Sequence, residues 1–537
     1  MATSIAAIDS ARGTRINREH VGWLAFGLLL AVYCGFFAQL TSYPYQDFVD
    51  HLARAVVMSD LMFDHGARFG DLFELRFMPI PYLLGDVALA ALVKLLGPSI
   101  AAALWMTLVL VSMPLALVFY THVNGPRGDR RIFVLLLSLY LATDWFFLLG
   151  FTQFRLGLAL MIVAMACADR MRDNPSRTAF AALCAALLVG YFTHLASIVF
   201  VAPALGVSGL VRLLYRRTTL RREIAIFAPV AAILLWHFGY ADHAYRGDAL
   251  PAYPYDWGTL DLRIWELEFE LLRFGRPPGK LLMILFALAV CWGLWRDLRW
   301  RNLLQPRVVE MAALAATFLG IYFVLPNSYA DASYVAVRAL ALVALFVVLG
   351  RAYLGADEHA TEPVFLQTFA VPLAALLAML NLMYLSVHLT RQNAFAAEYR
   401  RIVAQIPRGA TVLPVYTGGR EGMVRTRLHL GALAVMDRDA MVPYMFAGDA
   451  GHPMKYFRYR HRLYAPPEHW YTSTTTPVMV AWRPIACSYQ YLLMAKPYDA
   501  RKLSVRTSVR AENGSAALLA IHPEAHQCEG AREGGAD

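Results

Sequence analysis

The sequence predicts an all-α polytopic transmembrane bundle followed by a small C-terminal α/β domain. Three observations support this prediction. Hydrophobic residues make up 58% of the 537 residues, charged residues only 16%, and the mean hydropathy is +0.46, whereas a soluble globular chain carries about 25% charge. Long uncharged runs recur until about residue 390, and shorter β-rich runs follow them. This composition excludes a disordered chain, a fibrous repeat and an ordinary cytosolic enzyme.

The charge and cysteine content agree with a membrane protein. The net charge is +10 and the pI is about 9.3. In a membrane protein such an excess marks cytoplasmic loops and contact with lipid headgroups, so we expect the lipid bilayer as a partner and no nucleic acid. Cys487 and Cys528 lie in the soluble tail and can pair if that tail is extracytoplasmic.

The first span is predicted from charge. Residues 1–20 carry three arginines, and Val21 to Leu40 contains no charged residue. Because a span needs about 20 apolar residues, we expect an uncleaved signal anchor with its N-terminus in the cytoplasm. Further apolar runs complete a transmembrane domain over residues 21–389, at 79–97, 99–122, 132–150, 151–168, 178–194, 195–211, 223–240, 280–295, 311–328, 335–350 and 364–389.

Two long runs are predicted to be hairpins. Residues 178–211 are uncharged, and as one helix they would measure about 51 Å against a bilayer core of about 30 Å. Both flanks are rich in arginine and should be cytoplasmic, so the run crosses an even number of times and turns near Thr193-His194. The same reasoning places a turn near residues 151–155.

The remaining runs alternate across the membrane. Residues 41–78, residues 241–279 and the tail 390–537 are predicted to be outside the cytoplasm. The run 79–97 contains Asp86 and Lys94. If it is re-entrant or lies flat there are eleven spans, and if it crosses there are twelve. In the tail we expect a helix over 395–405 and strands at Ala410–Tyr416, Pro477–Trp482, Tyr489–Ala495 and Ala516–His522.

The first outside loop collects the most polar chemistry. Asp47, Asp50, His51 and Arg54 follow the spacing i, i+3, i+4 and i+7, so on a helix they share one face. One interpretation is an interfacial amphipathic helix with a solvated face. The other is a reaction site, because carboxylates in a buried position suit proton abstraction and arginine suits phosphate. Asp47, Asp50 and His51 would then also be candidate ligands for a divalent cation.

Other polar residues are predicted to lie at the same membrane face. They come from both hairpin turns, from the end of the span at 223–240 and from the start of the span at 335–350: Gln153, Arg155, Thr193, His194, Asp242, His243 and Arg338. An arginine inside a span is either functional or snorkels to the headgroups. His194 is more simply explained as a buried histidine with its hydrogen bonds satisfied inside the bundle. Asp144 is more simply explained as a partner in a hydrogen bond within the membrane.

The loop 241–279 adds aromatic and acidic residues. It contains Tyr253, Tyr255 and Trp257, and then Glu266, Glu268 and Glu270, which we expect on a helix. Such a loop suits sugar stacking, but Trp and Tyr also anchor plain loops at the membrane interface.

These motifs resemble the GT-C class of integral-membrane glycosyltransferases, especially a large bacterial group without assigned substrates. The first outside loop, Asp47-x-x-x-His51-x-x-Arg54, is similar to the acidic motif of that class. The segment Gly150 to Gly157 is similar to its aromatic-glycine hairpin, and His194 follows at the next outer turn. The likeness covers residues 20–390 in architecture. The family's usual Asp-Glu or single Asp is here split as Asp47 and Asp50, which leaves the base and any metal open.

The resemblance implies an enzyme in the bacterial inner membrane with a polyprenyl-phosphate-linked sugar as donor. A hydroxyl of a lipid, glycan or protein acceptor would displace the phosphate with inversion on the extracytoplasmic face. Asp47 would be the base, and Asp50 and His51 would support it or bind Mg or Mn. The leaving phosphate would be held by Arg338 and Arg155, within a substrate-binding set of His51, Arg54, Gln153, Arg155, His194 and Arg338.

Two other functions remain open from the sequence. A transporter or flippase of a lipid-linked or anionic solute would also need many spans and an intramembrane charge. It predicts inverted repeats and midplane polar residues, and the sequence contains no visible repeat. A non-catalytic membrane scaffold would tolerate replacement of Asp47.

Overall fold

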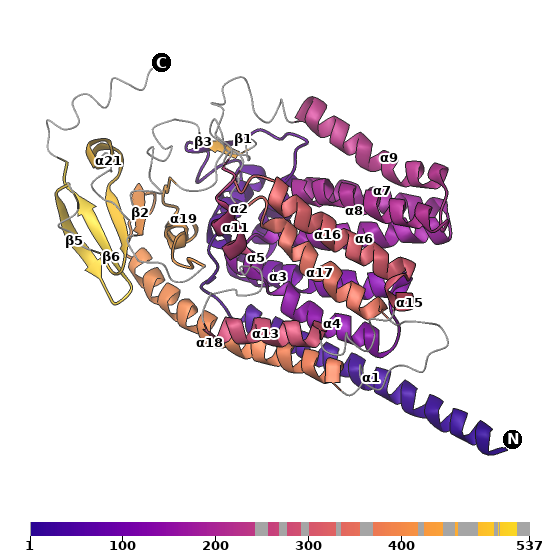
Figure 1. The fold of residues 1–537 in the computed structure, drawn as a ribbon. Helices are drawn as coiled ribbons and strands as arrows, with labels where there is room; N and C mark the ends of the chain where they lie inside the picture. The colour runs from indigo at the N-terminus through magenta and orange to yellow at the C-terminus, as the bar shows by residue number, and fades with distance from the viewer. Residues whose placement is uncertain are drawn as a thin grey trace.

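The computed structural model describes residues 2–241, 256–267, 277–291, 300–328, 334–354, 369–416, 424–443, 457–459, 482–498, 503 and 505–523. A bundle of long helices carries a small sheet at one end, and the N-terminus extends from the opposite end (Figure 1). We call these the domain-side end and the far end. Seven of the described helices are long and apolar enough to cross a membrane, so this is a multi-pass membrane protein.

The bundle follows the apolar runs of the sequence. Its helices are α1 (Ala2–Ala38), α3 (Leu83–Asn124), α4 (Asp129–Ala142), α5 (Trp145–Leu149), α6 (Thr152–Asp173), α7 (Arg177–Thr193), α8 (Leu195–Leu214), α9 (Leu220–Trp236), α13 (Pro277–Cys291), α15 (Trp300–Leu303), α16 (Pro306–Val324), α17 (Arg338–Tyr353) and α18 (Val371–Val403). A π-helix, η1 (His237–Ala241), continues α9. The turn predicted at Thr193-His194 is confirmed, because α7 gives way to α8 at His194. The turn predicted near residues 151–155 lies slightly earlier, at Gly150, because α6 already begins at Thr152.

The run predicted at 79–97 forms the first part of α3. Helix α3 is interrupted at Gly97, whose φ of 77° is left-handed, and Pro98 follows directly. Proline removes a helical hydrogen bond, and glycine tolerates positive φ, so the chain bends between two helical segments. Helix α3 packs on α6 and on α2 (Phe48–Phe63). The first segment therefore belongs to the packed bundle rather than to a detached loop.

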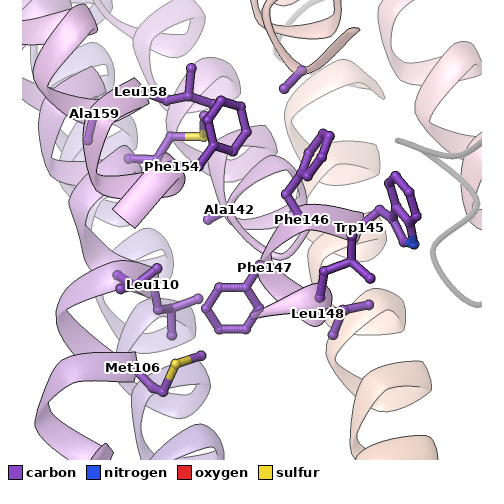
Figure 2. Packing of buried hydrophobic residues seen from close by; sticks show 14 of the residues in the cluster. Met106, Leu110, Ala142, Trp145, Phe146, Phe147, Leu148, Phe154, Leu158 and Ala159 are labelled. Carbon is purple, nitrogen blue, oxygen red and sulfur yellow. The ribbon is translucent and has the colours of Figure 1, made fainter. Parts of the chain in front are cut away.

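Short helix α5 carries an aromatic core. Trp145, Phe146 and Phe147 are all buried. The Phe147 ring meets Phe37 edge-on, with centroids 5.0 Å apart, and Tyr45 at 5.8 Å. Figure 2 shows Phe147 beside Leu110 and Met106 of α3. These contacts join α1, α3 and the loop before α2, and they hold that loop against the bundle.

The C-terminal domain contains a four-stranded sheet in the order β2-β4-β6-β5. Its strands are β2 (Val412–Tyr416), β4 (Tyr491–Ala495), β5 (Thr507–Glu512) and β6 (Ala516–Ile521). Strand β2 is parallel to β4, and the other pairs are antiparallel. A two-stranded ribbon pairs β1 (Phe73–Leu75) with β3 (Phe457–Tyr459), and the short helices are η3 (Leu430–Ala432), α19 (Leu433–Arg438) and α21 (Trp482–Ser488).

Three of the four predicted strands are confirmed, as β2, β4 and β6. Of the fourth, Pro477–Trp482, residues 477–481 lie outside the described residues, and Trp482 begins α21. The helix expected at 395–405 is the last part of α18, which runs without a break for 33 residues from the bundle into the domain. Glu398 of α18 accepts a hydrogen bond from Ser515 Oγ at 2.9 Å, so the sheet is attached directly to this helix.

The loop 241–279 is described only in part. Helix α11 (Leu260–Glu266) lies against the end of α16, where Arg263 donates to the carbonyls of Tyr322 and Leu325 at 2.9 and 2.6 Å. Asp242, His243, Tyr253, Tyr255, Glu268 and Glu270 lie outside the described residues. Cys487 is in a disulfide, and Cys528 also lies outside the described residues.

Candidate functional site

The loop before α2 is held against the α5–α6 turn by close backbone contact. The Asp47 amide donates to the carbonyl of Leu149 at 2.8 Å. Gly150 has φ +83°, and a Cβ at this position would lie 2.6 Å from the amide nitrogen of Phe48. Only glycine fits both conditions. The aromatic-glycine hairpin therefore sets the position of Asp47 and the start of α2.

Helix α2 presents the predicted polar face inward. It begins at Phe48, directly after Asp47, and buries Asp50 and Arg54 at 1% and 0% exposure. Val49 and Leu52, also on α2, are buried as well. The interpretation of α2 as an amphipathic helix with a solvated face is therefore excluded.

His429 from the C-terminal domain lies between the two carboxylates. Its Nδ1 is 2.7 Å from Asp50 Oδ2, and its Nε2 is 3.4 Å from Asp47 Oδ1. Burial lowers the pKa of His429, but Asp50 and Asp47 outweigh it and raise the pKa to about 10. Burial raises the pKa of Asp50, and the His429 charge opposes this. At neutral pH we therefore take His429 as an imidazolium between two acidic groups.

Arg54 ties α2 to α3. Its Nη2 donates to Asp86 Oδ1 at 2.7 Å and lies 2.9 Å from His51 Nδ1. Gln153, at the start of α6, donates to the same Asp86 oxygen at 2.5 Å. Gly85 permits this approach, since a Cβ there would lie 2.8 Å from Gln153 Cδ. His51, Arg54 and Gln153 are thus brought together as the sequence predicted.

Arg338 and His194 form the other side of the cluster. Arg338 Nη1 lies 3.1 Å from His194 Nε2, and its guanidinium stands over the rings of Phe151 and Phe154 at 5.1 and 5.3 Å. Burial lowers the pKa of His194, and the charges of Arg338 and His51 lower it further. Arg338 also forms a hydrogen bond with Tyr82, and the negative charge of Asp47 favours the charged form of the Arg338 guanidinium.

Arg155 is directed elsewhere. It forms a buried ion pair with Asp144 and donates to the carbonyl of Leu141 at 3.0 Å. The Asp144 side chain also caps α5 by accepting from the amide of Phe147 at 2.8 Å. Arg155 therefore holds α4, α5 and α6 together, and the structure does not bring it to the carboxylate pair.

Three members of the cluster were missed by the sequence analysis: Tyr82, Asp86 and His429. A carboxylate inside an apolar run was a visible signal for Asp86. His429 follows no motif, and its distance from Asp47 in the sequence hides the contact.

The expected metal ligands do not form a metal-binding group. Among the residues described here, no three His, Cys, Asp or Glu side chains gather in a way that could hold a metal ion. The Asp47–Asp50 pair instead faces an imidazole. We assign no step to a metal.

A second buried polar cluster lies at the far end, where α6 and α8 end and α9 and α16 begin. Asp169 contacts Arg212 at 2.7 Å and Arg307 at 2.8 Å. The whole network joins three acids to three arginines: Asp169, Glu223, Glu310, Arg172, Arg212 and Arg307. We call it the far-end network.

Comparison with known proteins gives the fold. No protein-family model matches the sequence, and no curated protein matches it. The crystal structure of ArnT from Cupriavidus metallidurans in the apo state aligns with 93% of this chain and 98% of its own, at 13% identity and a TM-score of 0.55. The crystal structure of the same protein bound to undecaprenyl phosphate aligns over the same shares, at 14% identity and a TM-score of 0.52. This chain has the ArnT fold. The prediction of a GT-C-like bundle is therefore confirmed.

Proposed function

We propose that this protein is a membrane glycosyltransferase that moves a sugar from a polyprenyl-phosphate donor to a hydroxyl acceptor. The observation that carries the proposal is the buried pair Asp47 and Asp50 at the domain-side end of an ArnT-like bundle, where the charge of Asp47 acts on Arg338. The likeness to a structure that binds undecaprenyl phosphate supports a lipid-phosphate donor.

Asp47 is the general base in this proposal. Its side chain keeps 12% exposure, whereas Asp50 keeps 1%, so only Asp47 can meet an incoming hydroxyl. The hydroxyl oxygen attacks the anomeric carbon while the bond from that carbon to the phosphate oxygen breaks. The hydroxyl proton passes to the Asp47 carboxylate, the configuration inverts, and polyprenyl phosphate leaves.

Arg338 stabilises the departing phosphate. Its guanidinium is held by His194 and by the faces of Phe151 and Phe154, and Asp47 acts on its charge. A preorganised positive charge lowers the barrier most where negative charge develops. Arg155 is paired with Asp144, so the proposal gives it no phosphate contact. His51, Arg54 and Gln153 shape the remaining wall of the site.

The reaction is assigned to the extracytoplasmic face of a bacterial inner membrane. The carboxylate pair lies at the end of the bundle that carries the C-terminal domain. The disulfide at Cys487 in that domain supports an oxidising compartment.

The test compares Asp47→Asn and Asp50→Asn with Asp64→Asn, an acidic residue at the end of α2 that is 39% exposed. Membranes with each full-length variant receive radiolabelled polyprenyl-phosphate sugars and an extract of envelope lipids and glycans. We expect Asp47→Asn to lower transfer about 10²–10⁴-fold and Asp64→Asn to leave it unchanged. Absence of transfer by the wild type from every donor, or full activity of Asp47→Asn, would overturn the proposal.

A further inference from the structure

A segment of the C-terminal domain is docked on the acidic loop. The Arg425 amide donates to Gln46 Oε1 at 2.9 Å, next to Asp47. Helix α19 and η3 both pack on α2. Arg68 joins Asp60, at 3.3 Å, to Asp439 of the domain, at 3.1 Å. These contacts hold the segment that contains His429 along α2, from the loop before it to Asp60.

His429 occupies the side of the carboxylate pair that faces the domain. The His429 side chain is 5% exposed, and each ring nitrogen faces a different carboxylate. The shorter contact is to Asp50, which is the more deeply buried acid. Asp50 therefore holds the imidazole, and the imidazole presents Nε2 to Asp47. The ring does not close the site, because Asp47 stays partly exposed.

We propose that His429 is a positioning residue of the transfer reaction and that the C-terminal domain thereby completes the site. The inference rests on the proposed function. Two carboxylates that share a buried site repel each other, and one of them tends to hold a proton. The His429 ring between them offsets this repulsion and contacts Asp47 through Nε2, while Asp47, the more exposed of the two acids, accepts the proton of the acceptor hydroxyl. The same contacts restrict the orientation of the Asp47 carboxylate.

The experiment measures transfer by full-length His429→Gln and His429→Ala. His522→Gln is the matched control, because His522 lies in the same domain and its side chain contacts Ser508 Oγ at 2.7 Å on an exposed surface. Each variant is first checked for the wild-type elution profile in detergent. The readouts are kcat, the KM for the donor, and the pH dependence of kcat/KM.

We expect His429→Gln to lower kcat roughly 10- to 100-fold, the usual cost of a misplaced reacting group. The KM for the donor should change little, because the donor phosphate is bound by Arg338. The acidic limb of the pH profile should move to higher pH, because a positive charge beside the carboxylates has been removed. Asp50→Asn combined with His429→Gln should lose no more activity than the larger single loss, since the two side chains act as one unit.

Two failures are distinguishable. If the wild type transfers sugar and His429→Gln behaves like His522→Gln, with the same kcat and pH profile, the role of His429 is overturned and the proposed function stands. The same holds if both His429 variants raise only the KM. If the wild type transfers nothing, the proposed function fails and the positioning role of His429 fails with it.

Discussion

The cluster around the carboxylate pair at the domain-side end and the far-end network both bury charge, and they are built differently. In the far-end network the acids face arginines directly, as Asp169 does with Arg212 and Arg307. At the domain-side end two carboxylates face one imidazole, and Arg338 rests on a histidine and two aromatic rings. A network of matched pairs locks helices together, whereas a cluster of titratable groups with perturbed pKa values suits chemistry.

The largest expected effect is a loss of stability when the far-end network is broken. Asp169→Asn removes the acid that three arginines share, and breaking a buried pair in this way costs about 3–5 kcal/mol. We expect loss of folded protein in detergent, measured by thermal unfolding of the purified chain. Asp173→Asn is the control, because Asp173 is 58% exposed and contacts only the rim of the network through Arg212. A stable but inactive Asp169→Asn protein would contradict the assignment of a structural role to the far-end network and a catalytic role to the domain-side cluster.

The next largest expected effect is a loss of activity when Arg338 is replaced. Arg338→Gln should lower kcat about 10²–10³-fold, as the loss of one charge-stabilising group does in other enzymes. The thermal stability should fall much less than in Asp169→Asn. The comparison is made in the same preparations, with transfer and unfolding measured side by side. If Arg338→Gln unfolds the protein as severely as Asp169→Asn does, Arg338 belongs with the structural charges.

A smaller effect concerns Arg155, which lies near the domain-side end but resembles the far-end charges. Arg155→Gln or Asp144→Asn alone leaves a buried charge without its partner. The double variant should recover about 0.5–3 kcal/mol of the summed loss, the usual coupling of residues in contact. Thermal unfolding of the four proteins measures it. Additive losses would show that the pair does not act as a unit.

The smallest effect is the pH dependence of domain docking. The pKa of His429 is about 10 in the folded protein, against about 6.5 for an ordinary histidine. The stability that this charge contributes is fully present below about pH 6.5 and is lost as the pH rises through about 10. The pKa of Asp50 is also raised, because burial disfavours the ionised carboxylate in the folded protein.

Limited proteolysis of the C-terminal domain at pH 7 to 10 measures this dependence. Cleavage of the wild type should accelerate with pH, and His429→Gln should cleave quickly throughout. A flat profile for the wild type would contradict an imidazolium at this position.

Much of the bundle could be predicted from the sequence, because apolar runs and arginine flanks are local signals. The hairpin turn at His194 followed from them, and the other turn lies at Gly150, just before the predicted residues 151–155. The spacing of the polar residues on α2 was visible, but the sequence left open whether that face is solvated or buried. Strand β5 was missed because Thr507–Glu512 is largely exposed and has no apolar run. Arg155 was placed at the right turn, but its sequence position does not give the direction of its side chain. His429 was missed because the contact with loop 41–78 joins distant parts of the chain.

Helix α18 connects the transmembrane bundle rigidly to the C-terminal sheet. At 33 residues it is about 50 Å long, and the sheet is bonded to its end through Glu398. Tilting a rod of that length by about 3° moves its end by about 2–3 Å, which is comparable to the contact between His429 and Asp50. The packing of α18 on α1, α4 and α13, which sets the tilt of a spanning helix, therefore also sets where the sheet lies.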